Sequence, residues 1–172
     1  MQIRRNCILP LLLALFVFLI QGCGDEDQII KREPAPGFTL KLFDGGNFNM
    51  SDHKGRPVIV NFFASWCIPC KTEAPILEKV YQEYYVKQEK PEEKVVFVGI
   101  AIQDTDSAAR AFVKETGLTF PTGLDGEGTI KQAFGVYGLP TTFFVGRDGL
   151  INYTHAGSIT EELLVNEMQK LY

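Results

Sequence analysis

One stretch of this chain constrains its fold and chemistry more than any other: Trp66-Cys67-Ile68-Pro69-Cys70. It directly follows an apolar run, residues 57–63, and precedes a segment with helical periodicity. Two thiols therefore stand where a strand ends and a helix begins. The unpaired N–H groups and positive dipole end of a helix N-terminus favour a thiolate on the first cysteine. The second sulfur can reach and attack a disulfide that the first one forms. The stretch predicts a redox-active pair.

Two other roles are open to such a pair. A purely structural disulfide is disfavoured because linking residues so close together constrains little chain entropy. Half of a zinc site is disfavoured because no second pair of Cys or His stands at ligand spacing. We therefore favour the redox interpretation and expect no metal and no cofactor.

The N-terminus has the layout of a signal peptide. A basic start with Arg4 and Arg5 leads into an apolar run of 13 residues, Ile8 to Ile20, which is too short to span a bilayer comfortably. The run ends in Ile20-Gln21-Gly22-Cys23, which resembles the lipobox of bacterial lipoproteins. That resemblance implies cleavage before Cys23 and attachment of a diacylglycerol to its sulfur. An uncleaved signal anchor with a chance cysteine is the alternative.

Cysteine usage fits this interpretation. Of four cysteines, Cys7 lies in the leader and Cys23 is the expected lipid site, so Cys67 and Cys70 are left for thiol chemistry. An exported protein with a single C-x-x-C pair is expected to exchange that disulfide. We expect a signal peptide at 1–22, a tether at 23–35 and one domain at 36–172. The domain is expected to be lipid-anchored outside the cytoplasm, on the periplasmic side or the outer face of the cytoplasmic membrane.

The charge balance argues against two kinds of partner. Removing the leader with its two arginines leaves 15 basic against 21 acidic side chains, a formal charge near −6. Such a balance argues against binding nucleic acid and against binding anionic lipid through a cluster of basic side chains.

The periodicity of apolar residues outlines an α/β domain. It predicts strands at 38–42, 48–50, 58–63, 95–102, 141–145 and 150–153, and helices from Cys70 to about 88, over 104–116, over 129–134 and from 158 to the C-terminus. Pro75 should bend the first helix. Thr105 or Asp106 is the expected N-cap of the second helix and Gly117 its stop, and Ser158 to Glu161 forms a capping box for the last. This order predicts a mixed central sheet flanked by helices, with an N-terminal β-hairpin extension.

Two motifs carry a family resemblance. Asn61-Phe62-Phe63-Ala64-Ser65-Trp66-Cys67-Ile68-Pro69-Cys70 and Gly138-Leu139-Pro140-Thr141-Thr142-Phe143 together resemble thioredoxin-fold proteins. The resemblance extends over roughly residues 36–172. It is similar more narrowly to the membrane-tethered TlpA/ResA group of extracytoplasmic thiol-disulfide oxidoreductases, many of which keep apocytochrome or other thiols reduced. The implied activity is that of a protein-disulfide reductase in cytochrome c biogenesis or cell redox homeostasis.

The resemblance assigns roles to five residues. Cys67 would be the attacking nucleophile, exposed at the helix start, and Cys70 the buried resolving thiol. Trp66 would cap the site and pack beside the sulfurs. Pro140 would be a cis-proline whose loop faces the disulfide and, with Leu139, pairs with a bound substrate.

One departure from cytoplasmic thioredoxins affects the mechanism. Asn61 stands where those proteins have a buried aspartate, and an amide cannot accept the resolving cysteine's proton. Glu73, three residues after Cys70, stands where ResA-like proteins place an acidic residue. We expect Glu73 to be the substitute acid/base, with a pKa raised by partial burial. The alternative is a solvated glutamate on the helix surface beside Lys71.

The expected partners are a disulfide-bearing exported protein, such as apocytochrome c, and a thiol electron donor in the membrane. A disulfide oxidase or isomerase using the same cysteines is an alternative. A copper metallochaperone using Cys67, Cys70 and His155 is another, although copper-delivering relatives space their cysteines one residue further apart. A peroxidase of the peroxiredoxin kind is disfavoured, since Ala64 stands where a Thr or Ser is needed.

Overall fold

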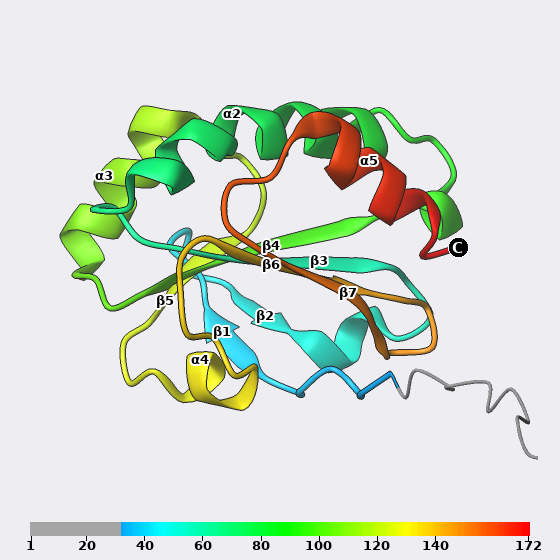
Figure 1. The fold of residues 1–172 in the computed structure, drawn as a ribbon, viewed down its shortest axis with the longest axis horizontal. Helices are drawn as coiled ribbons and strands as arrows, with labels where there is room; N and C mark the ends of the chain where they lie inside the picture. Colours follow the sequence, from blue (N-terminus) through cyan, green and yellow to red (C-terminus); the bar gives the residue numbers. More distant parts are fainter. Residues whose placement is uncertain (1–31) are drawn as a thin grey trace, which may run out of the picture. The chain divides into compact units, whose positions relative to one another are not determined.

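The computed structural model describes residues 32–172; the predicted signal peptide and the predicted lipid site Cys23 lie outside the described residues. Its main sheet has five strands in the order β5-β4-β3-β6-β7 (Figure 1). They are β3 (Val58–Phe63), β4 (Val96–Ile102), β5 (Thr122–Asp125), β6 (Thr141–Val145) and β7 (Ile151–Ala156). The first three run parallel, and β6 and β7 are antiparallel to their neighbours, so the predicted mixed sheet is confirmed. All six residues of the central strand β3 are buried, as its mostly apolar character predicts.

Helices cover both faces of this sheet. On one face lie α2 (Ile68–Tyr81), α3 (Asp106–Thr116) and α5 (Glu161–Gln169); on the other lie the short α4 (Thr129–Ala133) and a hairpin of β1 (Thr39–Lys41) and β2 (Asn47–Asn49) (Figure 1). Three short turns complete the order: η1 (Met50–His53), η2 (Gln82–Val86) and η3 (Pro91–Glu93). This is the thioredoxin fold with an N-terminal hairpin extension, as predicted. In the part of the chain that the structure describes, no helix has the length and apolar character needed to cross a bilayer.

The period-two alternation of β3 divides the core into two layers. Ile59 and Phe63 face the layer shared with α2, α3 and α5, which also contains Cys67 and Cys70. Val58, Val60 and Phe62 face the layer shared with the hairpin and α4. Burying each of these phenylalanines contributes about 1.5–3 kcal/mol to stability. Apolar packing therefore holds the three helices to one face of the sheet, and the hairpin and α4 to the other.

The hairpin lies directly against the edge of the sheet at Gly123. A Cβ atom at this position would lie 2.2 Å from the carbonyl oxygen of Lys41 and 2.9 Å from Cγ of Leu40, so only glycine permits this approach. An isolated bridge between Leu42 and Gly123 joins the hairpin to β5. The hairpin extension is therefore part of the packed domain.

Helix ends test the capping predictions. Thr105 is the N-cap of α3, its Oγ1 accepting from the Ala108 N–H at 3.2 Å, and Gly117 ends that helix with a left-handed φ of 72°. The capping box predicted at Ser158 is wrong: α5 starts at Glu161, because Thr160 caps it by accepting from the Leu163 N–H at 3.3 Å. The regular part of the first helix stops at Tyr81 and gives way to the π-helical turn η2, short of the predicted end near 88.

Candidate active site

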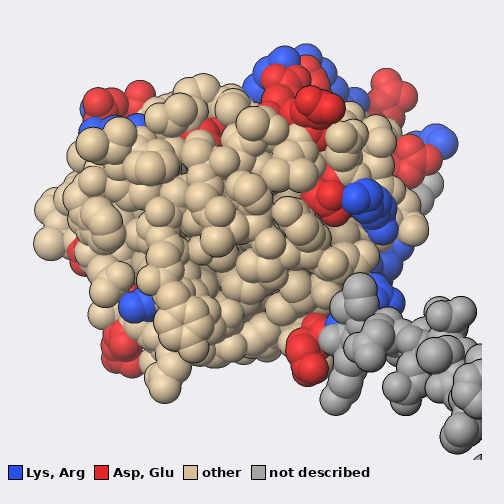
Figure 2. Space-filling view, in the orientation of Figure 1, with Lys and Arg blue, Asp and Glu red and all other residues tan. Residues whose placement is uncertain are grey.

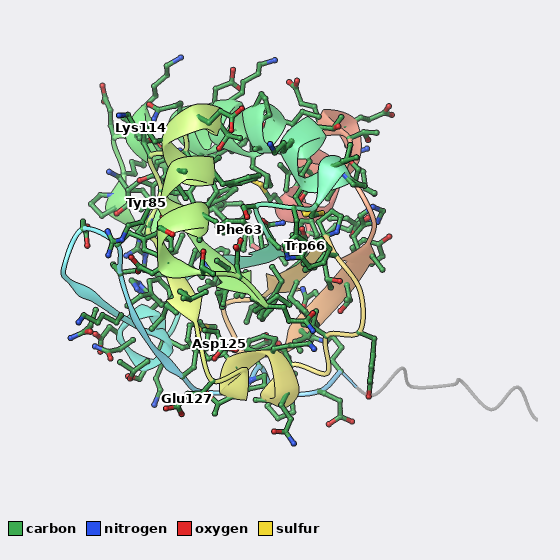
Figure 3. All side chains as sticks on the ribbon, turned by 90° about the vertical axis from the view of Figure 1, so that its left-hand side faces the viewer. Phe63, Trp66, Tyr85, Lys114, Asp125 and Glu127 are labelled. Atoms are coloured by element: carbon green, nitrogen blue, oxygen red, sulfur yellow. A yellow bond between two sulfur atoms is a disulfide. The ribbon has the colours of Figure 1, made fainter. Side chains whose placement is uncertain are left out.

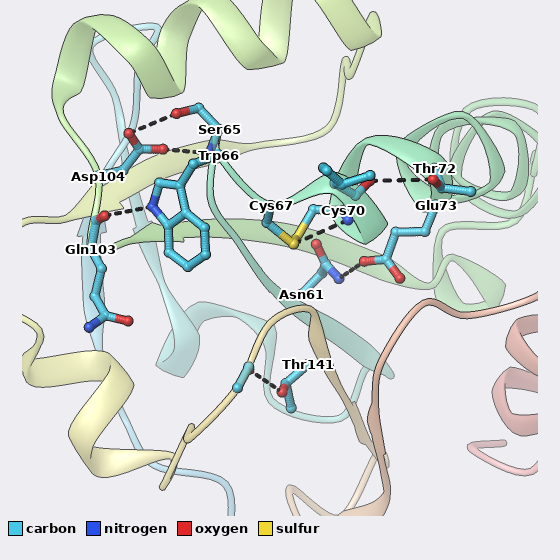
Figure 4. Close-up of a disulfide and its surroundings, with 12 residues drawn as sticks. Asn61, Ser65, Trp66, Cys67, Cys70, Thr72, Glu73, Gln103, Asp104 and Thr141 are labelled. Atoms are coloured by element: carbon cyan, nitrogen blue, oxygen red, sulfur yellow. Dashed lines mark hydrogen bonds between the residues drawn. A yellow bond between two sulfur atoms is a disulfide. The ribbon is translucent and has the colours of Figure 1, made fainter.

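The two cysteines lie where the sequence places them, at the start of α2. Cys67 is the N-cap of this helix and Cys70 lies in its first turn, and they form a disulfide with a Cα–Cα distance of 5.3 Å. The Cys70 N–H donates to the Cys67 sulfur at 3.2 Å (Figure 4). A backbone donor and the helix N-terminus both stabilise negative charge on this sulfur, so they favour a thiolate on Cys67 once the disulfide is reduced.

Both cysteines are buried, and Cys67 is more enclosed than expected. Cys70 is 1% exposed, as predicted for a resolving thiol, but Cys67 is only 4% exposed, so its predicted exposure is wrong for this oxidised form. The reason is that its sulfur is bonded to buried Cys70 and packs in the apolar layer with α2 and α5. The exposed neighbours are Trp66 and Ile68, at 60% and 77%. The exposed rim beside the disulfide is therefore apolar.

Trp66 is held in place by the loop that follows β4. Its indole N–H donates to the carbonyl oxygen of Gln103 at 2.9 Å, while both the N–H and the hydroxyl of Ser65 donate to the Asp104 carboxylate, at 2.6 and 2.9 Å (Figure 4). Gln103 has a left-handed φ of 53°, which is uncommon for a residue other than glycine. Figure 3, which looks onto this end of the sheet, shows the position of Trp66, which is 60% exposed.

Sequence reasoning missed Gln103 and Asp104 as parts of the site. The available signal was positional: β3 and β4 are parallel, so residues that follow each strand meet at the same sheet edge.

The proline predicted to be cis is cis, at Leu139–Pro140. The next residue, Thr141, pairs with Phe62 of β3, so Pro140 lies at the sheet edge from which the loop to Cys67 departs. Thr141 donates its hydroxyl hydrogen to the Gly138 carbonyl oxygen at 2.8 Å, which ties this turn together (Figure 4). The turn that precedes β6 and the loop that follows β3 therefore lie at the same end of two neighbouring strands.

Glu73 is buried, at 1% exposed, so the solvated alternative is wrong. Its Oε2 accepts from the Ile159 N–H at 3.0 Å and its Oε1 from the Asn61 amide at 2.8 Å. Burial raises the pKa of this carboxyl to about 7, and the two hydrogen bonds oppose part of that rise. An acid that titrates near neutral pH one helical turn from Cys70 is suited to proton transfer.

His155 does not join the cysteines in a metal site here. It lies on β7 opposite Thr142, and its Nε2 is 3.3 Å from the carbonyl oxygen of Ser158. Among residues 32–172 no group of three or more His, Cys, Asp or Glu side chains is placed to hold a metal ion.

One face beside the site has almost no formal charge. Residues 132–146 and 149–160, which form β6, β7 and the loops at their ends, contain no Asp, Glu, Lys or Arg. Figure 2 shows this face, with charged side chains confined largely to its margins. A cleft of about 470 Å³ lies between Gln103 and α4, and its lining combines Tyr137, which is 99% exposed, with the charged residues Asp125, Glu127 and Lys131.

Comparisons with known proteins agree with this geometry. The model of the AhpC/TSA family matches residues 32–154. The thiol-disulfide oxidoreductase ResA of Oceanobacillus iheyensis is 34% identical over 168 residues, covering 94% of this chain and 84% of that protein. ResA of Bacillus subtilis is 29% identical, covering 96% and 90%.

Solved structures give the same picture. A putative thiol:disulfide interchange protein DsbE from Chlorobium tepidum matches with a TM-score of 0.73 and 26% identity, over 82% of this chain and 96% of that one. A secreted Mycobacterium tuberculosis disulfide oxidoreductase matches with a TM-score of 0.66 and 28% identity, over 78% and 96%.

Proposed function

The chain belongs to the AhpC/TSA family and is a thiol-disulfide oxidoreductase, and we propose that it works as a reductase of disulfides in exported proteins, with Cys67, Cys70 and Glu73 as its reacting groups. The observation that carries this proposal is the buried Glu73, which titrates near neutral pH one turn from a disulfide at a helix start. Each cycle needs a proton transfer at Cys70, and Glu73 is the acid/base group that lies on the same helix as Cys70.

The cycle exchanges one disulfide for another. The Cys67 thiolate attacks one sulfur of the substrate disulfide, forming a mixed disulfide and releasing the other substrate sulfur as a thiolate. Glu73 then takes the proton of the Cys70 thiol, and the Cys70 sulfur attacks Cys67. This second attack releases the remaining substrate thiolate and leaves the Cys67–Cys70 disulfide. Two electrons have passed to the substrate, and a membrane thiol donor restores the dithiol by the reverse exchange.

The surface around the cysteines supports a polypeptide substrate. Trp66 and Ile68 form an exposed apolar rim, and the uncharged face beside them offers no selection by charge. A cysteine-bearing chain without folded structure can meet such a rim with its apolar side chains. Leu139 and Pro140, at the same sheet edge, are the proposed backbone partners. Apocytochrome c, whose haem-attachment C-x-x-C-H stretch carries two thiols, is the proposed substrate class.

The protein is proposed to act outside the cytoplasm, held to the membrane by lipid on Cys23. The support is the leader sequence and its lipobox-like end, together with the secreted oxidoreductase among the similar structures. Retention of the purified mature protein on membranes, compared with a Cys23→Ala variant, tests the anchor: release of the variant alone is expected. Equal retention of both proteins would contradict it.

The reductase role is tested with the reduced protein and an oxidised C-x-x-C-H peptide. We expect rapid appearance of two peptide thiols per protein, with a rate that rises with pH around neutral. Glu73→Gln should remove that pH dependence, whereas the matched control Glu78→Gln should keep it, since Glu78 lies on the same helix but bonds the Thr119 N–H. An unchanged profile in Glu73→Gln would refute the role of Glu73. Oxidation of peptide thiols by the disulfide form, without the reverse reaction, would favour the oxidase.

A further inference from the structure

Asn61 is the one polar residue of the buried strand β3. It stands in the middle of β3, between Val60 and Phe62, and is 3% exposed. By strand alternation its side chain points to the same face as Ile59 and Phe63, the layer that contains both cysteines. A buried amide without hydrogen bonds costs free energy, so its partners indicate why it is tolerated there.

Those partners come from two other elements. The amide nitrogen donates to Oε1 of Glu73 at 2.8 Å and to Oγ1 of Thr142, on β6, at 2.9 Å. The ionised carboxylate can only accept, so in this form the nitrogen end of the amide faces Glu73. The oxygen end is thereby turned away from Glu73, and Figure 4 shows it on the side of the two sulfurs.

We propose that Asn61 is a positioning residue that holds the Glu73 carboxylate in place for its proton transfer with Cys70. This inference rests on the proposed role of Glu73. Through Thr142, two residues after Pro140, the same amide also connects the carboxylate to the strand of the cis-proline turn. An amide does this without adding charge. An aspartate at the same position would put two carboxylates side by side, and only one of them would ionise readily.

The direction in which Asn61 shifts the pKa of Glu73 follows from the hydrogen bond that its amide donates. A hydrogen bond to the carboxylate stabilises its charged form, and the Asn61 bond is one of the two that oppose the effect of burial on the Glu73 pKa of about 7. Removing it should raise the pKa of Glu73 by about one pH unit, the effect of one hydrogen bond to a charged group. Near pH 7 the ionised fraction then falls from about one half to about one tenth. The attack of Cys70 on the mixed disulfide should slow about fivefold.

The test follows the carboxyl-carbon NMR shift of Glu73 against pH in the oxidised protein, and the resolving rate in the reduced one. Asn61→Leu should move the Glu73 midpoint upward. Asn61→Asp, which keeps a polar group on β3, should also move it upward through carboxylate repulsion. The control Thr142→Val removes only the second acceptor of the amide and should leave the midpoint in place.

Three results separate the possibilities. An upward shift in both Asn61 variants, with none in Thr142→Val, supports the inference. An unmoved midpoint in Asn61→Leu overturns it, even if Glu73→Gln abolishes the pH dependence of the resolving step. If Glu73→Gln leaves that dependence intact, the proposed role of Glu73 fails, and with it the inference that Asn61 serves proton transfer.

Discussion

Glu73 makes the folded protein less stable as pH rises, and the size of the effect can be worked out. The folded pKa of about 7 lies above the ordinary value of 4.5, so the folded state binds more protons than the unfolded state between these values. Stability therefore falls as pH rises through that window and is level above it. A difference of about 2.5 pH units at 1.36 kcal/mol each amounts to about 3 kcal/mol. This cost is absent below about pH 4.5 and complete at about pH 8.

The variant Glu73→Gln removes the charge and hence this pH dependence. Its amide oxygen can still accept from Asn61, but its NH₂ group then faces the Ile159 N–H, a mismatch of about 1–3 kcal/mol that does not change with pH. Denaturant unfolding of the oxidised protein, followed by circular dichroism at several pH values, separates the pH-dependent cost of the Glu73 charge from the constant cost of the mismatch. The stability of the wild type relative to Glu73→Gln should fall by about 3 kcal/mol from about pH 4.5 to about pH 8.

Glu78→Gln, on the same helix but bonded to Thr119, is the control and should retain the fall in stability that Glu73 causes. Parallel curves for the wild type and Glu73→Gln would refute the reasoning, because they would mean that burial does not raise the pKa of this carboxyl.

Three further predictions follow from single sites. Cys70→Ser should accumulate the mixed disulfide between Cys67 and substrate, visible on a non-reducing gel; rapid release of substrate from this variant would contradict the assignment of Cys70 as the resolving thiol. Asp104→Ala should cost about 1–3 kcal/mol in unfolding free energy and alter Trp66 fluorescence, because the carboxylate holds the N–H and hydroxyl of Ser65. An unaltered fluorescence would show that Asp104 does not position this loop. Gly123→Ala should lower the melting temperature, since the new Cβ would meet the Lys41 carbonyl. A melting temperature equal to the wild type would mean that the hairpin yields without cost.

The local patterns of the chain predicted the α/β class with a mixed sheet, and the resemblance supplied the thioredoxin fold. β3 reads as a continuous apolar run because it is buried on both faces, and Thr105 and Gly117 carry the chemistry that starts and stops α3. The last helix was mispredicted because Ser158 and Thr160 both have the chemistry of an N-cap. Only the chain's path after β7 decides between them.

The candidate site was partly readable from sequence. The cysteines follow from spacing, whereas the partial burial of Glu73 was expected from the resemblance to ResA-like proteins, with a solvated glutamate as the alternative. The loop at Gln103 and Asp104 could not be identified, because its contact with Ser65 spans 39 residues and depends on parallel strands ending together. The enclosure of Cys67 was missed for a similar reason, since the packing of α5 against α2 is set by tertiary structure.

The central claim is that the Cys67–Cys70 pair donates electrons to substrate disulfides. Its reduction potential, read through the fluorescence of Trp66, the single tryptophan, in thiol redox buffers, tests this most directly. The account predicts a value near that of thioredoxin, about −270 mV, which a membrane thiol donor can sustain. A value near about −120 mV, as in a strong periplasmic oxidant, would contradict it and identify a disulfide-forming enzyme.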